Sequence, residues 1–289
     1  MIVLEQILNG LLVGSYYIVL ALGLSLIFSL GGVVNLAHGA FYALGAYLAY
    51  EVERRLGFFP ALAISPVLVA VIGMVIERFA LRRLYGEDPI LGLLFTFGLA
   101  MTAEQTLRMI WGTTGLNFAI PDALRGQLLL GDFIYSYYRL AVLAICIASI
   151  LGCWLLLTRT AFGMIVRAGV QDPEMVRVMG IQLRPILTLV FGLGVALAGL
   201  AGVISAPMAG VQPAMGIEIQ TAAFVIVVIG GLGSFWGVVI SALLVGVVRG
   251  ITIHFIPAAG EASMYVLMFL VLLFRPRGLL GERIEKFET

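Results

Sequence analysis

The sequence predicts an all-α, polytopic bundle of transmembrane helices that forms a single domain over residues 1–289. Hydrophobic residues make up 62% of the chain and charged residues only 11%, whereas about a quarter of the residues in a soluble domain are charged. A helix needs about 20 apolar residues to cross a bilayer, so a chain of this length has room for about eight or nine such segments. The composition excludes an ordinary soluble domain, and no basic cluster indicates binding to nucleic acid.

Nine hydrophobic runs follow one another along the chain. They cover residues 6–30, 33–50, 58–78, 89–111, 137–158, 184–206, 219–231, 235–253 and 262–274. The runs at 33–50 and 219–231 are short or interrupted by glycine, which predicts broken or short helices near 31–39 and 219–233. The pattern alone does not decide whether these two segments cross the membrane completely. The first run is too long, and its N-terminal flank too poor in basic residues, for a cleavable signal peptide.

Polar residues gather at the first break, which follows Gly31 and Gly32. Asn35, His38 and Gly39 lie here, and polar groups inside apolar spans are costly enough to indicate a purpose. They either line a path for a zwitterionic or amide-bearing solute, or they satisfy backbone groups freed by the break. Two further candidates for the path are Tyr42, one helical turn beyond His38, and Thr96 in the fourth run.

The fourth run and the loop after it carry the next polar signals. Glu104 and Arg108 are spaced i,i+4, which predicts an ion pair along the helix. Residues 112–132 form the longest predicted outer loop, and loops of this length are often functional, although a plain connector is the alternative.

Catalytic, metal and nucleotide motifs are absent from the sequence. His38 and His254 are the only histidines and lie far apart, so no metal site is predicted. A phosphate-binding P-loop needs Gly-Lys-Ser/Thr, but the only lysine is Lys286. Cys146 and Cys153 are seven residues apart in one run, which separates them by about 10.5 Å along a helix and forbids a disulfide between them. The sequence therefore predicts a protein that is not an enzyme and binds no cofactor itself.

A very short helix is predicted within the polar loop at residues 159–184. Asp172 suits the N-cap position and Pro173 the first helical position, while Glu174 complements the helix dipole. Gly180 then supplies a stop. Barely two turns fit between these signals, too few to be stable alone in water.

The apolar residues of this short helix suggest a contact with another protein. Met175, Val176 and Met179 are predicted to share one face, with Arg177 elsewhere. An apolar face on the wet side of a membrane protein favours a partner's groove, and the alternative is a helix that lies on its own protein.

The second break, at Gly230 and Gly231, resembles the first. Each places two glycines at the inner end of a run, followed by an aromatic residue and a helix rich in small residues. Such a likeness is typical of the internal repeats of transporters, whose discontinuous helices meet at the translocation path. Close packing of glycine-rich helices is the alternative.

The distribution of basic residues predicts the orientation. If the 159–184 loop is cytoplasmic, eleven arginine and lysine residues fall on the inner side and six on the outer side, as the positive-inside rule requires. The N-terminus is then periplasmic and the C-terminus cytoplasmic. The Arg54–Arg55 pair, on the outer side, is the exception.

The chain resembles the LivH-type permease subunits of branched-chain amino acid ABC importers, within the branched-chain/ribose-type permease superfamily. The resemblance runs from about Leu8 to Leu279 and rests on NGLLVGSYYIVLALGLSLIFSLGGVVNLAHGAFYALGAY, TFGLAMTAEQTLRMIWG, GMIVRAGVQDPEMVRVMGI with LAGLAG, and IGGLGSFWGVVISALLVG. By match to the family's coupling loop, residues that contact or support an ATPase would include Gly163, Arg167, Ala168, Asp172, Gly180 and Ile181. Val176 stands where these permeases commonly carry alanine, which suggests a reshaped ATPase contact, and Asp172 stands where asparagine is frequent.

The resemblance implies a multi-pass subunit in the bacterial inner membrane, in contact with lipid. Its partners would be a second, LivM-like permease, two cytoplasmic ATPase subunits that hold ATP and magnesium, and a periplasmic substrate-binding protein. Branched-chain amino acids are the default substrate, and relatives of this architecture also serve urea, short amides and other amino acids. A gradient-driven carrier or channel, and a structural or receptor subunit without a path, are the alternatives of other classes. Whether the two permeases of a complex are identical is not decided by the sequence.

Overall fold

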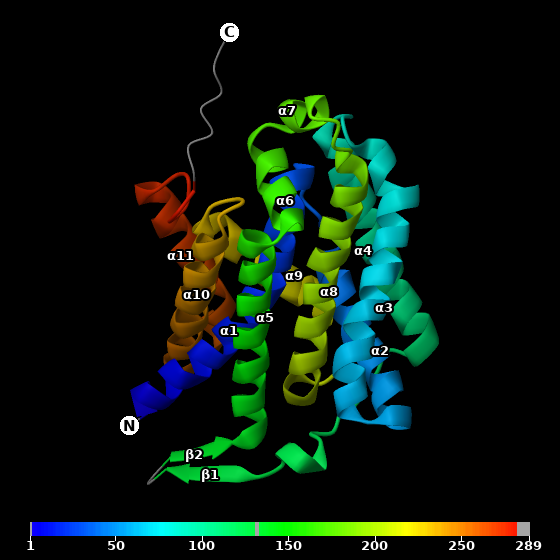
Figure 1. The fold of residues 1–289 in the computed structure, drawn as a ribbon. Helices are drawn as coiled ribbons and strands as arrows, with labels where there is room; N and C mark the ends of the chain where they lie inside the picture. Colours follow the sequence, from blue (N-terminus) through cyan, green and yellow to red (C-terminus); the bar gives the residue numbers. More distant parts are fainter. Residues whose placement is uncertain (1, 131–132, 282–289) are drawn as a thin grey trace.

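The structure, a computed structural model, describes residues 2–130 and 133–281 and is almost entirely helical (Figure 1). Nine long helices match the nine hydrophobic runs: α1 (Ile2–Gly31), α2 (His38–Leu56), α3 (Phe58–Phe79), α4 (Pro89–Trp111), α5 (Tyr137–Arg159), α8 (Leu183–Ala209), α9 (Met215–Gly230), α10 (Phe235–Phe255) and α11 (Gly260–Phe274). Shorter elements join them: η1 (Leu81–Leu84), η2 (Asp122–Leu124), β1 (Gln127–Leu130), β2 (Phe133–Ser136), α6 (Ala161–Gln171), α7 (Pro173–Val178) and η3 (Pro257–Ala259). The prediction of an all-α polytopic bundle is confirmed.

Seven helical segments of the described chain are long and apolar enough to cross a membrane, the last of them formed by η3 and α11 together (Pro257–Phe274). Helices α2 and α9 lie outside this set. Helix α9 has only 16 residues, and α2 carries Glu51, Glu53, Arg54 and Arg55 in its last turns. These are the two segments that the glycine breaks single out in the sequence, so the prediction of short or broken helices there is confirmed.

Helices α1 and α8 form the centre of the bundle. Their apolar windows are 78% and 61% buried, whereas those of the other five spans are 11–28% buried. A helix that is apolar on every side belongs in the interior, and small residues let these helices pack backbone to backbone. For example, a Cβ atom added to Gly23 on α1 would lie 2.3 Å from the Gly194 carbonyl oxygen on α8. The remaining helices expose broad apolar surfaces to lipid or to partner subunits.

The bundle has two distinct ends, which we call the α7 end and the hairpin end. Figure 1 places α7 and the C-terminal side of the chain at one end, and the N-terminus and the β1–β2 hairpin at the other. Nine arginines of the described chain lie at the α7 end: Arg78, Arg82, Arg83, Arg159, Arg167, Arg177, Arg184, Arg275 and Arg277. Arg283 and Lys286, which the sequence count also places there, lie outside the described residues.

The loop at residues 112–132 holds a small β-hairpin that the hydrophobicity pattern did not predict. Strands β1 and β2 pair antiparallel, with Gln127 opposite Ser136 and Leu128 opposite Tyr135. The same loop is tied to the connection between α8 and α9, because the Leu116 amide donates to the Val211 carbonyl at 2.7 Å and the reverse bond measures 3.1 Å. The loop is therefore a bracing element and not a loose connector.

Two smaller predictions are also confirmed. Cys146 and Cys153 are both free and buried on α5. Arg108 donates from Nε to Glu104 Oε1 at 3.0 Å, forming the predicted i,i+4 pair on α4.

Candidate translocation site and coupling loop

The break between α1 and α2 is held by side chains from three helices. His38 is fully buried and its Nε2 lies 2.9 Å from the Leu20 carbonyl oxygen on α1. The Asn35 side-chain oxygen accepts from the Ala37 amide at 3.0 Å. Thr96 on α4 accepts from the Leu36 amide at 3.2 Å. The structure thus favours the interpretation in which Asn35 and Thr96 satisfy backbone amides freed by the break, and it shows that His38 fixes the start of α2 to the interior of α1.

Gln220 on α9 completes this support, although nothing in its sequence context indicated it. Its side-chain oxygen accepts from the Gly39 amide at 2.6 Å, and its side-chain nitrogen donates to the Asn35 carbonyl at 3.3 Å. One amide side chain therefore serves a donor and an acceptor at the start of α2, which a Gln can do because it carries both functions. The two short helices, α2 and α9, are joined through this residue.

Gly39 allows α2 and α9 to cross at backbone distance. A Cβ atom at this position would lie 2.0 Å from the Gly216 carbonyl oxygen and 2.9 Å from Gln220 Cβ. Since the first of these atoms belongs to a helix backbone, the two helices would have to separate. Gly39 is thus a packing residue, whatever its relation to a path.

Replacing Gly39 by alanine is expected to destabilise the protein. Forcing one methyl group into a closed contact costs about 1–3 kcal/mol. Gly98→Ala is a matched control, because Gly98 lies in α4 with no heavy atom within 4 Å of an added Cβ. The melting temperature of the purified complex should fall for Gly39→Ala and hold or rise slightly for Gly98→Ala. Equal melting temperatures would contradict the close crossing.

Two cavities flank the exposed side of α9 in its first half. One, of about 250 Å³, is mainly apolar and lies between α2, α4 and α9, where Phe97, Met101 and Gln220 contribute to its wall. The other, of about 340 Å³, is more polar and lies between α1, α9, α10 and α11, with Tyr42 in its wall. Ile217 and Thr221 line both. Of the residues predicted to line a path, Tyr42 is the one whose side chain faces either cavity.

Gly230 and Gly231 lie at the α7 end, in the turn between α9 and α10. The last carbonyls of α9 are capped by the chain after α11: the Leu279 amide donates to the Ile229 carbonyl at 2.7 Å, and the Leu280 amide to that of Gly230 at 3.1 Å. Gly231 has a φ of 98°, which only glycine adopts freely. The structure gives both glycines a role in the turn, away from the two cavities. The proposed internal repeat stays a prediction.

The loop at residues 159–184, which the resemblance matches to a coupling loop, contains the short helix that the capping signals predict. The Asp172 side chain accepts from the Glu174 and Met175 amides at 3.1 and 2.9 Å. Pro173 begins α7, and Gly180, with a φ of 81°, follows its end. The six-residue helix is preceded by a second helix, α6, which the sequence did not distinguish from the loop.

The exposed apolar face of α7 differs from the predicted one. Val176 is only 3% exposed and is buried against its own chain, so the prediction that it shares an exposed face with Met175 and Met179 is wrong. The free face comprises Met175 (52% exposed), Val178 (82%) and Met179 (69%). These positions are spaced i, i+3 and i+4 and therefore adjoin on the helix. Val176 anchors α7 to the bundle, and it cannot act as a direct contact with a partner in this arrangement.

The other predicted coupling residues fix α6 and α7 to the spans. Gly163 is buried where a Cβ atom would meet the carbonyl oxygens at the end of α5. Arg167 donates from its guanidinium to the Leu157 carbonyl. The Ala168 carbonyl accepts from the Asp172 amide at 2.9 Å, and the Ile181 amide donates to the Val176 carbonyl at 3.3 Å. Helix α7 is thus joined to α5 through α6, and it also packs against α8.

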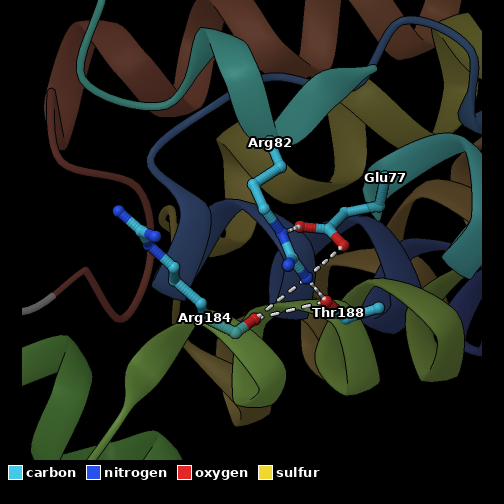
Figure 2. Close-up of polar contacts among 4 residues, drawn as sticks. All are labelled: Glu77, Arg82, Arg184 and Thr188. Carbon is cyan, nitrogen blue, oxygen red and sulfur yellow. Dashed lines mark hydrogen bonds and ion pairs between the residues drawn. The ribbon is translucent and has the colours of Figure 1, made fainter. Parts of the chain in front are cut away.

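A buried charge cluster lies where the coupling loop enters α8 (Figure 2). Arg82 in η1 donates to both carboxylate oxygens of Glu77, at 3.5 and 3.3 Å, and the Glu77 side chain is fully buried. Arg82 also donates to the Thr188 hydroxyl and, at 3.5 Å, to the Arg184 carbonyl. Figure 2 shows the Arg184 guanidinium turned away from this cluster. The first turn of α8 is therefore fastened to the end of α3.

Tyr85 lies beside this cluster in the connection between η1 and α4. Burial, with a further contribution from Glu77, raises the pKa of its phenol well above the ordinary value, and Arg82 only partly opposes this. The hydroxyl is therefore neutral across the physiological pH range, and Arg82 remains the partner of Glu77.

Comparison with known proteins identifies the family. The profile of the family described as branched-chain amino acid transport system / permease component matches residues 6–275. The chain belongs to this family. The short capped α7 and the two interrupted helices are therefore features of a transport permease, and the protein is a multi-pass membrane protein.

Relatives match this permease over nearly its whole length. The high-affinity branched-chain amino acid transport system permease protein BraD of Pseudomonas aeruginosa is 30% identical, over 98% of this chain and 97% of BraD. The corresponding protein LivH of Escherichia coli K12 is 26% identical, over 98% of this chain and 97% of LivH. The LivM permease of the same organism is 28% identical, over 91% of this chain and 67% of LivM.

One solved structure shares the fold. PsaBC from Streptococcus pneumoniae, in complex with a Fab, superposes with a TM-score of 0.51 at 13% sequence identity, over 92% of this permease and 89% of that chain. At this identity the likeness concerns the fold alone.

Three features of the structure were not predicted from the sequence. Gln220, the Glu77–Arg82 pair and Val178 became apparent only in the structure. A weak signal existed for the pair, because Glu77 is an acidic residue at the end of an otherwise apolar run, and such residues usually have a partner.

Proposed function

We propose that this permease is a membrane subunit of a binding-protein-dependent ABC importer that moves branched-chain amino acids into the bacterial cytoplasm. A second permease, which need not be identical, pairs with it in the inner membrane. Two cytoplasmic ATPase subunits bind ATP and magnesium, and a periplasmic binding protein delivers the substrate. The family and the named substrates of BraD and LivH support this assignment.

The exposed apolar face of α7 is the observation that carries the proposal. Met175, Val178 and Met179 are held outward on a helix fixed by an Asp172 cap and by the buried Val176. An apolar face of this kind at the wet end of a membrane protein fits the groove of a partner, and the sequence has no P-loop of its own. ATP hydrolysis on the partner would displace α7, and α5 and α8 would carry the displacement into the spans as a conformational switch.

The orientation follows from the same assignment. The α7 end carries nine of the arginines of the described chain and the hairpin end six, which by the positive-inside rule supports a cytoplasmic position for α7. The N-terminus then faces the periplasm and the C-terminus the cytoplasm. The polar cavity is lined partly by the α8–α9 connection and the first turns of α9 and α11, and in this orientation it would lie in the periplasmic half, where a binding protein would release its substrate.

Reconstitution tests the proposal. Proteoliposomes that contain this permease, its partner permease and the ATPase subunits should accumulate radiolabelled leucine only with ATP at the ATPase side and binding protein at the other. Urea, short amides and other amino acids should be tested as alternative substrates in the same vesicles. Uptake by this chain alone, without ATP, would reject the importer in favour of a gradient-driven carrier or channel.

A further inference from the structure

The polar cavity beside α9 brings together charged groups of both signs. It has a volume of about 340 Å³ and lies toward the hairpin end. Arg249 reaches it from α10, Glu218 from the first turn of α9 and Glu261 from the first turn of α11. The hydroxyl-bearing side chains of Tyr16, Tyr17 and Tyr42 complete the polar part of its wall.

Arg249 lacks the partners that a half-buried arginine requires. Its Nε is buried without a hydrogen bond, and over residues 2–130 and 133–281 no carboxylate lies within 4.0 Å of its guanidinium. An unsatisfied donor on a charged group is costly, so its retention at a cavity wall indicates a ligand. The planar guanidinium matches the geometry of a carboxylate, which it binds in a bidentate manner.

The carboxylates in the same wall define the other end of such a ligand. Glu218 and Glu261 are both exposed to the cavity opening and form none of the ion pairs in the described ranges. A molecule with one carboxylate and one ammonium group would therefore satisfy Arg249 and at least one of these acids at once. A simple anion would pair only with Arg249, and a simple cation only with the two glutamates.

The apolar part of the cavity suits an aliphatic side chain. Met215, Ile219 and Met264 line it and are 6%, 9% and 5% exposed. Beyond Ile217 and Thr221 lies the second cavity, of about 250 Å³, whose wall is mainly apolar. The polar cavity is at the small end of the usual range for ligand sites and the apolar cavity is just below that range, which fits a small solute.

We propose that this cavity is a binding site for an α-amino acid zwitterion with an apolar side chain. The Arg249 guanidinium receives the carboxylate, and Glu218 and Glu261 receive the ammonium group. The site holds the solute at the periplasmic half of the permease before it moves past α9. This inference rests on the proposed function, which supplies the direction of transport and the amino acid class.

Direct binding to the assembled complex tests the site without the binding protein. The complex of permeases and ATPases, free of nucleotide and of binding protein, is incubated with tritiated L-leucine in a scintillation proximity assay. Arg249→Gln should lower the affinity at least about tenfold, because it removes a hydrogen-bonded contact between two charged groups. The double variant Glu218→Gln/Glu261→Gln should lower it similarly. Arg125→Gln is the control, because Arg125 is a basic residue of the hairpin end paired with Asp122 outside the cavity.

Ligand analogues give an independent reading of the same contacts. L-leucinamide, which lacks the carboxylate, should compete at least about tenfold more weakly than L-leucine in the wild type, and Arg249→Gln should remove this discrimination. 4-Methylpentanoate, which lacks the ammonium group, should regain relative affinity in the double glutamine variant. Arg249→Lys keeps the positive charge and therefore separates loss of the guanidinium–carboxylate contact from loss of folding. Co-purification of the ATPase subunits checks that each variant complex assembles.

The outcomes distinguish failure of the proposed binding site from failure of the proposed importer function. Uptake of leucine by wild-type vesicles is measured in parallel. Suppose that the wild type imports leucine with ATP and binding protein. The proposed site is then rejected, and the importer function is kept, if Arg249→Gln binds leucine as tightly as the wild type does. The same conclusion follows if the wild type shows no saturable binding of leucine. If wild-type vesicles do not import leucine, the proposed function itself fails.

Discussion

Replacing Val178 and Met179 together by aspartate is expected to abolish ATP-driven uptake by the assembled importer. These residues are 82% and 69% exposed on α7, and we propose that they enter a groove on the ATPase. Loss of a well-packed apolar contact at the centre of an interface costs at least about 2–4 kcal/mol. Each 1.4 kcal/mol corresponds to a factor of ten in affinity, so association should weaken by about two orders of magnitude or more.

The measurement is co-purification of the ATPase subunits with tagged permease, together with uptake in vesicles. Met109→Asp is the matched control, since Met109 is 86% exposed at the opposite, hairpin end of the bundle. The control should retain both ATPase and uptake. Wild-type association of the double variant would show that α7 is not the docking element and would leave the proposal without its main support.

The helical architecture could be predicted from the sequence because each helix is determined by residues close together in the chain. Apolar runs of sufficient length determine the spans, and the cap residues of α7 act within a few positions of one another, so Asp172, Pro173 and Gly180 predicted it. The i,i+4 pair of Glu104 and Arg108 is local in the same sense. A local signal for the β-hairpin also existed, because Gly131-Asp132 separates two apolar stretches, a pattern that favours a tight turn, but hydrophobicity alone concealed it.

The features that were missed depend on which helices meet. Gln220 binds the Gly39 amide across 181 positions of sequence, and no periodicity reveals such a partner. Val176 appeared to belong to the exposed face of α7, but a six-residue helix has fewer than two turns, too few repeats for the sequence to show which side is covered. The polar cavity likewise combines residues of α1, α9, α10 and α11, and only tertiary structure brings them together.

The close packing around Gly39 and Gly231 limits what substitutions of these glycines can show about function. Tolerance of bulky residues at Gly39 and Gly231 would be one way to recognise a subunit without a path. In the structure an added Cβ at Gly39 meets the backbone at 2.0 Å, and one at Gly231 meets Gly281 at 2.6 Å. Either substitution would disturb packing in any subunit with this fold, so intolerance would not indicate a path. Arg249 and Glu218, which line the polar cavity, are the better probes.

Replacing Arg82 by methionine is expected to destabilise the permease strongly. The change leaves the Glu77 carboxylate, which is fully buried, without its ionic partner. Removing one member of a buried pair costs about 3–5 kcal/mol, because the remaining charge is uncompensated. Thermal unfolding of the purified complex should show a large fall in melting temperature. Arg125→Met is the control: its pair with Asp122 is exposed to solvent on both sides, and such pairs contribute about 1 kcal/mol or less.

A double substitution separates the effect of the buried charges from the effect of the hydrogen bonds that Arg82 makes to α8. Glu77→Met together with Arg82→Met removes both charges, and apolar replacement of a buried pair is often neutral for stability. The double variant should therefore recover most of the lost melting temperature. It still lacks the bonds from Arg82 to Thr188 and to the Arg184 carbonyl, which fasten the first turn of α8 to α3.

Uptake by this double variant then reports on coupling alone. Because α8 directly follows the coupling loop, loosening its first turn should lower the amount of leucine imported per ATP hydrolysed while the ATPase subunits stay bound. A double variant with wild-type stability and wild-type uptake per ATP would show that the cluster serves only to neutralise a buried charge. If instead stability does not recover, the contacts of Arg82 to α8 contribute to folding more than its pairing with Glu77 does.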